Sequence, residues 1–209
     1  MKRGVRSASS ASLRWSARSA FAGGALSILV ALLTLTNPDY YLFSSPPDFL
    51  VPIAEGSALL AVMGGLSGLH VLQKDRYGRV GKAGFIAAFA GVFLAGAGHL
   101  LALPFLEFVN TGSVAYVLVG LDQGVFLPLG TGYVLGAFLM SLGFAVFGLA
   151  SARARALPLW CGPVLIGGVA GLWALGNAGG WTAFGLAWIL TGYALRSAGR
   201  TEPQASRVR

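Results

Sequence analysis

The chain has 209 residues, of which 56% are hydrophobic and only 11% are charged, with a formal net charge of +8. Soluble domains have about 25% charged residues and about 7% glycine, whereas this chain has 31 glycines. The composition excludes an ordinary soluble domain and predicts an integral membrane protein, in which small residues let helices approach closely. The basic residues are dispersed without interleaved aromatic residues, so nucleic acid is not an expected partner.

Residues 1–18 contain five Lys and Arg and no acid, and we expect a basic cytoplasmic tail there. The apolar run 20–36 follows, so the pair resembles a signal peptide. No A-x-A-like cleavage site comes after the run, because Asn37-Pro38-Asp39 follows it directly. We therefore expect an uncleaved first transmembrane helix that runs outward and ends at an outer loop over 37–48.

Five further apolar segments approach or exceed the length that crosses a hydrocarbon core of ~30 Å. With the first, they make a six-helix domain over 19–197, followed by a basic tail over 198–209. Their expected bounds are 49–73, 83–109, 126–150, 159–176 and 181–195. Segment 110–124 is apolar but too short to span, and either an interfacial or a re-entrant segment is expected there.

Local patterns add detail to these helices. Gly64 and Gly68 have the G-x-x-x-G spacing that suits a close helix crossing. Asn177 to Gly180 read as a tight turn between the last two helices.

The turn-rich segment 74–82 orients the whole chain. Cytoplasmic loops collect basic residues, and this segment carries Lys74, Arg76, Arg79 and Lys82. With this loop in the cytoplasm, all 15 Lys and Arg of the chain fall in cytoplasmic segments and none in an outer loop. The sequence therefore predicts an all-α, polytopic helical bundle of the cell membrane with six transmembrane helices and both termini cytoplasmic.

The same distribution of charge indicates the expected partners. Lipids with anionic headgroups are expected at the cytoplasmic face. A second copy of the chain, or another membrane protein, is left open as a further partner.

Glu55 and His99 are the ionisable residues that fall well inside the predicted spans. Such residues are costly in hydrocarbon and are candidates for function by default. Counting ~1.5 Å per residue from Asp48 and from Lys82 places both at a similar depth near the outer face. They could form a proton-responsive or ligand-binding pair in an outward-facing cavity. Alternatively, they form a buried hydrogen bond that fixes helix register, or Glu55 simply reaches outer water.

The remaining candidate residues have simpler structural explanations. Glu107 and Asp122 mark the outer edge and could ring an entrance, although loop acids are usually just solvated. His70 is expected to face the inner interface, and Cys161 to serve packing or to accept an acyl chain. Trp173 and Trp188 are expected to be packing surface.

Known catalytic patterns are not found in the sequence. There is no H-E-x-x-H, no G-x-S-x-G and no P-loop. No catalytic residue, metal site or cofactor is therefore expected.

Two short runs resemble small bacterial multi-pass membrane proteins of unassigned activity. The first is Gly68 to Phe85, around the basic turn, and the second is Arg155 to Gly162. The resemblance implies a bacterial six-helix type and carries over no functional residue.

Three functions remain open from the sequence. The first is a non-enzymatic structural, accessory or sensory protein, favoured by the glycine content and the scarcity of polar groups in the spans. The second is a small transporter or channel with Glu55 and His99 at an outer-leaflet site, although a pore needs more polar lining. The third is an intramembrane enzyme, which the missing motifs disfavour.

Overall fold

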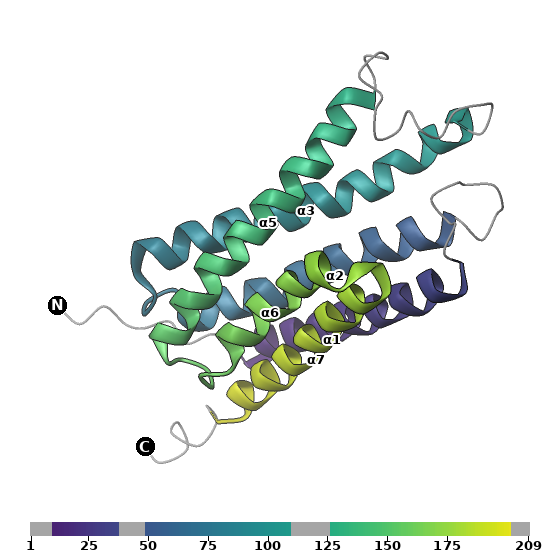
Figure 1. Ribbon diagram of the computed structural model, residues 1–209. Coiled ribbons are helices and arrows are strands. Elements are labelled where there is room, and N and C mark those ends of the chain that lie inside the picture. The colour runs from purple at the N-terminus through teal and green to yellow at the C-terminus, as the bar shows by residue number, and fades with distance from the viewer. Residues whose placement is uncertain (1–9, 38–48, 110–125, 202–209) are drawn as a thin grey trace, which may run out of the picture.

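The computed structural model describes residues 10–37, 49–109 and 126–201, and in this part of the chain every regular element is a helix (Figure 1). The helices are α1 (Ser10–Thr36), α2 (Leu50–Gln73), α3 (Gly78–Val109), α5 (Phe126–Ala154), α6 (Cys161–Ala174) and α7 (Gly176–Thr201). The prediction of an all-helical bundle is confirmed for the described residues.

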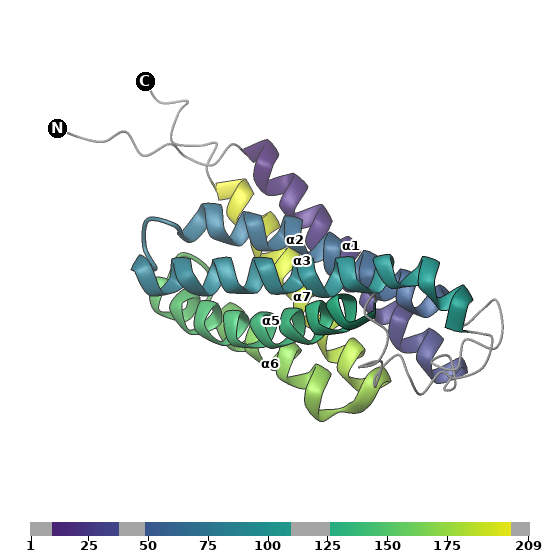
Figure 2. The ribbon, with the colours of Figure 1, turned by 90° about the horizontal axis from the view of Figure 1, so that it is seen from above.

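The helices close into a ring. Each helix packs against its neighbours in the sequence, and α1 also packs along α7, so the first and last helices meet. Consecutive helices run in opposite directions, and the two views in Figures 1 and 2 agree on this. A smaller contact between α2 and α7 crosses the ring.

One end of the ring carries the described basic residues. The start of α1, the α2–α3 turn, the α5–α6 turn and the end of α7 lie together at this end, which we call the basic end (Figures 1 and 2). Its Lys and Arg are Arg14, Arg18, Lys74, Arg76, Arg79, Lys82, Arg153, Arg155, Arg196 and Arg200. Charge is therefore segregated along the bundle axis, as the sequence pattern predicts.

Four helices are long and apolar enough to cross a membrane, over Ala11–Thr36, Leu50–Gln73, Gly78–Leu101 and Gly132–Ala154. Their outward faces are apolar too, with Leu32, Phe93 and Phe138 all more than half exposed. A helix that is hydrophobic all round suits a lipid surround. The structure thus fits a membrane-embedded protein.

The first helix begins earlier than predicted, at Ser10 rather than at residue 20, so the second half of the segment expected as a basic tail is helical. Leu13 and Ala17 are buried, and a β-carbon at Gly68 of α2 would collide with Ser16. Ala, Leu, Arg and Ser are compatible with a helix, and this one gains packing partners on α2 and α7. At ~1.5 Å per residue α1 is about 40 Å long, which exceeds the thickness of a ~30 Å hydrocarbon core.

The basic turns are shorter than predicted. α3 begins at Gly78, so Lys74 and Arg76 lie in the α2–α3 turn while Arg79 and Lys82 lie on the helix itself. Gly78 has a φ of 65°, a left-handed conformation that reverses the chain at low cost for glycine.

The interval that the predicted helices 126–150 and 159–176 leave between them also begins too early. α5 continues to Ala154 and ends where Arg155 adopts a φ of 49°. Ala, Ser and Arg extend the helix, and it stops before the proline at 158.

The predicted turn at Asn177–Gly180 is wrong, because these residues belong to α7. The chain reverses instead at Leu175–Gly176, where Gly176 has a φ of 68°. Gly180 serves packing, since a β-carbon there would lie 2.7 Å from Leu172 Cα of α6. Glycine at this position lets two backbones touch rather than bending one of them.

α3 and α5 meet along a regular seam of small residues. The opposed positions are Gly84–Phe147, Ala88–Gly143, Gly91–Met140, Ala95–Gly136 and Gly98–Tyr133. Steps of four and three residues along α3 match equal steps backward along α5, which is an antiparallel heptad pattern. A β-carbon at Gly91 or Gly143 would collide with backbone atoms of the other helix. The seam therefore fixes the register of the two helices.

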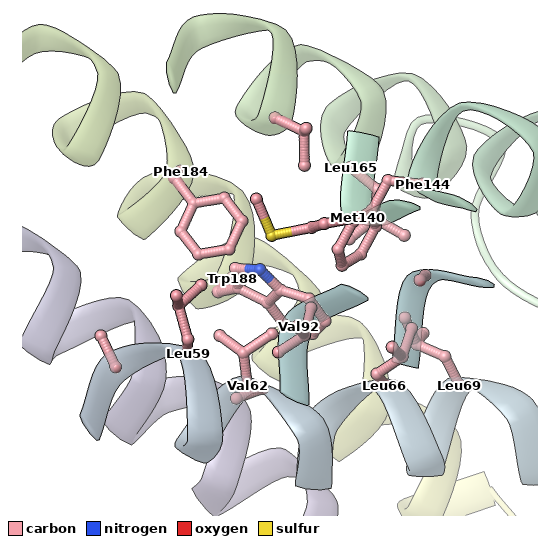
Figure 3. Close-up of a cluster of buried hydrophobic side chains, with 14 of the residues drawn as sticks. Leu59, Val62, Leu66, Leu69, Val92, Met140, Phe144, Leu165, Phe184 and Trp188 are labelled. Atoms are coloured by element: carbon pink, nitrogen blue, oxygen red, sulfur yellow. The ribbon is translucent and has the colours of Figure 1, made fainter. Parts of the chain in front are cut away.

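Apolar side chains fill the middle of the ring (Figure 3). Trp188 of α7 lies at the centre, with Phe144 of α5 and Phe184 of α7 packed edge-to-face against it at ring distances of 5.9 and 6.3 Å. Around them, Figure 3 labels Leu59, Val62, Leu66, Leu69, Val92, Met140 and Leu165. We call this group the apolar plug, because it separates the polar groups at the two ends of the bundle.

Candidate functional site

Glu55 and His99 are in contact across the α2–α3 interface. Glu55 is the sixth residue of α2, which starts at the end opposite the basic end, and His99 lies in the half of α3 nearest that end. His99 Nδ1 is 3.1 Å from Glu55 Oε2, and the side chains are only 16% and 6% exposed. The two residues that the sequence placed at one depth therefore form a buried pair.

Close backbone approach brings the pair together. A β-carbon at Gly56 would lie 2.7 Å from Leu100 Cγ and 2.9 Å from the Gly96 carbonyl oxygen. Gly56 and Gly96 are thus the point at which α2 and α3 touch, next to Glu55 and near His99. Small residues at a crossing allow short polar side chains to meet between helices.

Trp181 completes the hydrogen bonding of the carboxyl group. It is the sixth residue of α7, is 7% exposed, and its side chain hydrogen-bonds Glu55. The indole N–H can only donate, so a carboxyl oxygen of Glu55 accepts. Sequence reasoning missed this partner. A Trp at the start of a predicted helix that begins on the same side as α2 was the available signal, because a buried indole N–H usually finds a hydrogen-bond partner.

Tyr133 covers the imidazole from α5. Its ring packs edge-to-face on His99 with 4.9 Å between centroids. At this point a β-carbon added to Gly98 of α3 would lie 3.5 Å from Tyr133 Cβ. The site therefore takes one residue from each of four helices: Glu55, His99, Tyr133 and Trp181.

The chemistry available to this site is the sharing of a proton. Either the His99 imidazole donates to the Glu55 carboxylate, or a protonated Glu55 donates to Nδ1 of a neutral imidazole. A single proton between His99 Nδ1 and Glu55 Oε2 forms the hydrogen bond in both protonation states. The hydrogen bond from the Trp181 side chain to Glu55 is present in each. Among the described residues no group of three or more His, Cys, Asp or Glu is placed to hold a metal ion.

The other predicted site residues lie apart from this pair. The four basic residues Lys74, Arg76, Arg79 and Lys82 are exposed at the basic end. Glu107 belongs to α3 in a stretch whose side chains are not described, and Asp122 lies outside the described residues.

A second polar group lies at the basic end, where only an interfacial His70 was expected. The Tyr77 hydroxyl hydrogen-bonds His70 Nδ1, and Phe85 stacks on the imidazole with 4.1 Å between centroids. Tyr77 lies in the α2–α3 turn and is 8% exposed. Burial and the nearby Asp75 carboxylate raise the pKa of Tyr77 to about 12, so its hydroxyl stays protonated and able to donate at neutral pH.

Of the remaining aromatic and sulfur candidates, Trp188 and Cys161 are buried packing residues and Trp173 is exposed. Trp188 is buried in the apolar plug, and Cys161 is 1% exposed. Trp173 is exposed and donates to the Ser141 hydroxyl at 2.9 Å, which ties α6 to α5.

No family model, curated protein or solved structure matches the chain.

Proposed function

We propose that the chain is a non-enzymatic, six-span protein of the bacterial cytoplasmic membrane, with a structural, accessory or sensory role. The observation that carries this proposal is the Glu55–His99 pair, bonded by Trp181 and set beyond the apolar plug. Its hydrogen bonds join α2, α3 and α7, and the side chains that fill the ring support a packed bundle rather than a water-filled path. In this role the pair is a polar clasp between helices.

A double-mutant cycle on the clasp tests the proposal. We expect Glu55→Gln and His99→Ala each to lower the unfolding temperature in detergent, with a coupling of about 0.5–2 kcal/mol between them, as for polar contacts in other helical membrane proteins. Asp75→Asn, in the exposed turn at the basic end, is the matched control and should change little. Full additivity of the two substitutions would contradict a clasp.

A small transporter with an outer-leaflet site is the second candidate. It is favoured by the retention of two ionisable side chains inside apolar helices, which is costly unless they are used. Proteoliposomes that enclose a pH-sensitive dye separate the two candidates. The first proposal expects proton entry no faster than in protein-free vesicles, whereas entry that is lost in Glu55→Gln would support the transporter.

Six spans require the α6–α7 hairpin to cross the membrane. α6 has 14 residues, about 21 Å at ~1.5 Å per residue, so this short helix decides the topology. A Cys161→Ser background allows single cysteines to be labelled with an impermeant maleimide in intact cells. We expect labelling at Leu175→Cys, an exposed position of the α6–α7 turn, and none at Arg76→Cys. The absence of labelling at position 175 would favour a re-entrant hairpin.

Anionic lipid is the proposed partner of the basic end. The ten Lys and Arg there meet the charge of phosphatidylglycerol headgroups. We expect the unfolding temperature to be higher in phosphatidylglycerol than in phosphatidylcholine, with the difference reduced by high salt.

A further inference from the structure

Gln73 and Ser151 are buried polar residues at the basic end, and neither takes part in the sites described above. Gln73 is the last residue of α2 and is fully buried, and Ser151 near the end of α5 is 3% exposed. Both amide atoms of Gln73 and the Ser151 hydroxyl lack a hydrogen-bond partner among the described residues. Three such atoms close to one end of a bundle are unusual, because buried polar groups are almost always bonded.

Ser151 differs from most other described helical hydroxyls. The usual partner is a carbonyl three or four residues back, as for Ser141 with Ala137 and Thr191 with Ala187, both at 2.8 Å. This bond is open to any helical serine, yet the Ser151 hydroxyl does not make it. The hydroxyl is therefore directed away from its own backbone.

Tyr77 links the surroundings of the two residues. Its N–H donates to the Gln73 carbonyl oxygen at 3.2 Å, and its ring packs on Phe147 with 5.8 Å between centroids. Ser151 follows Phe147 by one helical turn, and Gln73 follows Leu69 by one turn. Phe147 and Leu69 belong to the same buried cluster, so Gln73 and Ser151 continue the inward faces of α2 and α5 beyond it.

The chemistry of the two side chains defines an occupant. An amide and a hydroxyl both donate and accept hydrogen bonds and carry no charge. The charged neighbours Lys74, Asp75 and Arg76 are exposed, so they face solvent. We propose that Gln73 and Ser151 are two walls of one internal site at the basic end, and that this site binds ordered water.

The replacement of both side chains by apolar ones tests the site. If water bridges them, Gln73→Met and Ser151→Ala each lower the unfolding temperature by about 2–4 °C, the shift that corresponds to one lost hydrogen bond in a chain of this size. The shift in unfolding temperature of the double variant should be smaller than the sum of the two single shifts, because either substitution alone already disrupts the water that both side chains bind. If the groups are simply unsatisfied, both substitutions leave the temperature unchanged or raise it, which overturns the proposal.

Ser27→Ala is the matched control for Ser151→Ala. Ser27 is also fully buried, but its hydroxyl bonds Gly23 within its own helix at 2.8 Å. Ser27 and Gln73 share no hydrogen-bond partner, so we expect the effects of Ser27→Ala and Gln73→Met on the unfolding temperature to be additive. Additive losses for Gln73→Met and Ser151→Ala would place them in separate sites and overturn the shared one.

X-ray radiolysis identifies the occupant without any substitution. Hydroxyl radicals formed from a bound water oxidise the side chains beside it, so Phe147 should be modified within milliseconds. Phe184 in the apolar plug is equally buried and should be protected. Equal protection of the two phenylalanines overturns water as the occupant, even if Gln73→Met fails to fold.

Discussion

At the scale of single residues, the clasp is explained by position along helices. Glu55 and Trp181 each occupy the sixth position of a helix, and both side chains are buried. The carboxyl group bonds the indole N–H and contacts His99. A buried carboxyl group is tolerated because both partners are provided by other helices. Its loss therefore affects the association of helices rather than the stability of one helix.

Trp181→Phe should lower the free energy of unfolding by about 1–2 kcal/mol, since it removes a donor to a buried carboxyl group and keeps most of the ring. Urea or thermal unfolding in detergent measures this loss. Trp173→Phe removes an indole bond that is exposed, and it should cost much less. Equal losses in the two variants would mean that the Trp181 ring matters only by its volume.

Tyr77 provides a test by pH at the basic end. Its pKa is raised from 10.0 to about 12, so the folded state keeps the proton that the unfolded chain releases first. This stability is complete below pH 10 and is lost as the pH rises to about 12. Absorbance of tyrosinate at 295 nm should show a step near pH 12 that Tyr77→Phe removes. A step near pH 12 that is unchanged in Tyr77→Phe would show that Tyr77 ionises at a different pH.

At the scale of elements, glycine decides how helices meet. The α3–α5 seam repeats small residues in a heptad pattern, and backbone atoms occupy the space beside Gly91 and Gly143. Gly132 and Gly167 have the same chemistry but open space around them. Glycine content in the sequence therefore predicts close packing but not which glycines perform it.

Gly91→Ala should destabilise the protein by about 1–3 kcal/mol, because the added methyl group forces α3 and α5 apart. Gly167→Ala should be neutral or stabilise it by up to about 1 kcal/mol through helix propensity. Unfolding of the two variants in the same detergent makes the comparison direct. A harmless Gly91→Ala would show that the seam is loose.

Helix class, approximate helix bounds and the common depth of Glu55 and His99 follow from the sequence, because they depend on hydropathy and on residue counts. Helix ends and partners do not follow. Asn177–Gly180 has turn composition, yet contact with Leu172 keeps Gly180 in a helix. The role of Trp181 depends on Glu55, and the role proposed for Gln73 depends on Ser151, which are both far away in the sequence. Long-range packing therefore decided the partners that local pattern missed.

At the scale of the whole molecule, the ring depends on contact between its first and last helices. α1 and α7 share one of the largest interfaces. A β-carbon at Gly24 of α1 would lie 2.7 Å from the Gly185 carbonyl oxygen of α7. Near the basic end, Leu13 of α1 is fully buried and lies beside Gly199 of α7. The first turns of α1, which were expected to belong to the basic tail, therefore help to close the ring against α7.

Leu13→Ala should lower the free energy of unfolding by about 2–5 kcal/mol, as for other buried leucines. Trp15→Ala, two residues away and 71% exposed, should leave the unfolding midpoint in detergent nearly unchanged. If Leu13→Ala were equally mild, the first turns of α1 would contribute nothing to closure of the ring.

The meeting of α1 with α7 has a consequence for the order of synthesis. A ribosome delivers α1 before α7, so the face of α1 that carries Gly24 has no helix packed against it until α7 follows. A chain that stops before α7 leaves that face without its helix partner. The ring of described helices can therefore close only after α7 has been made.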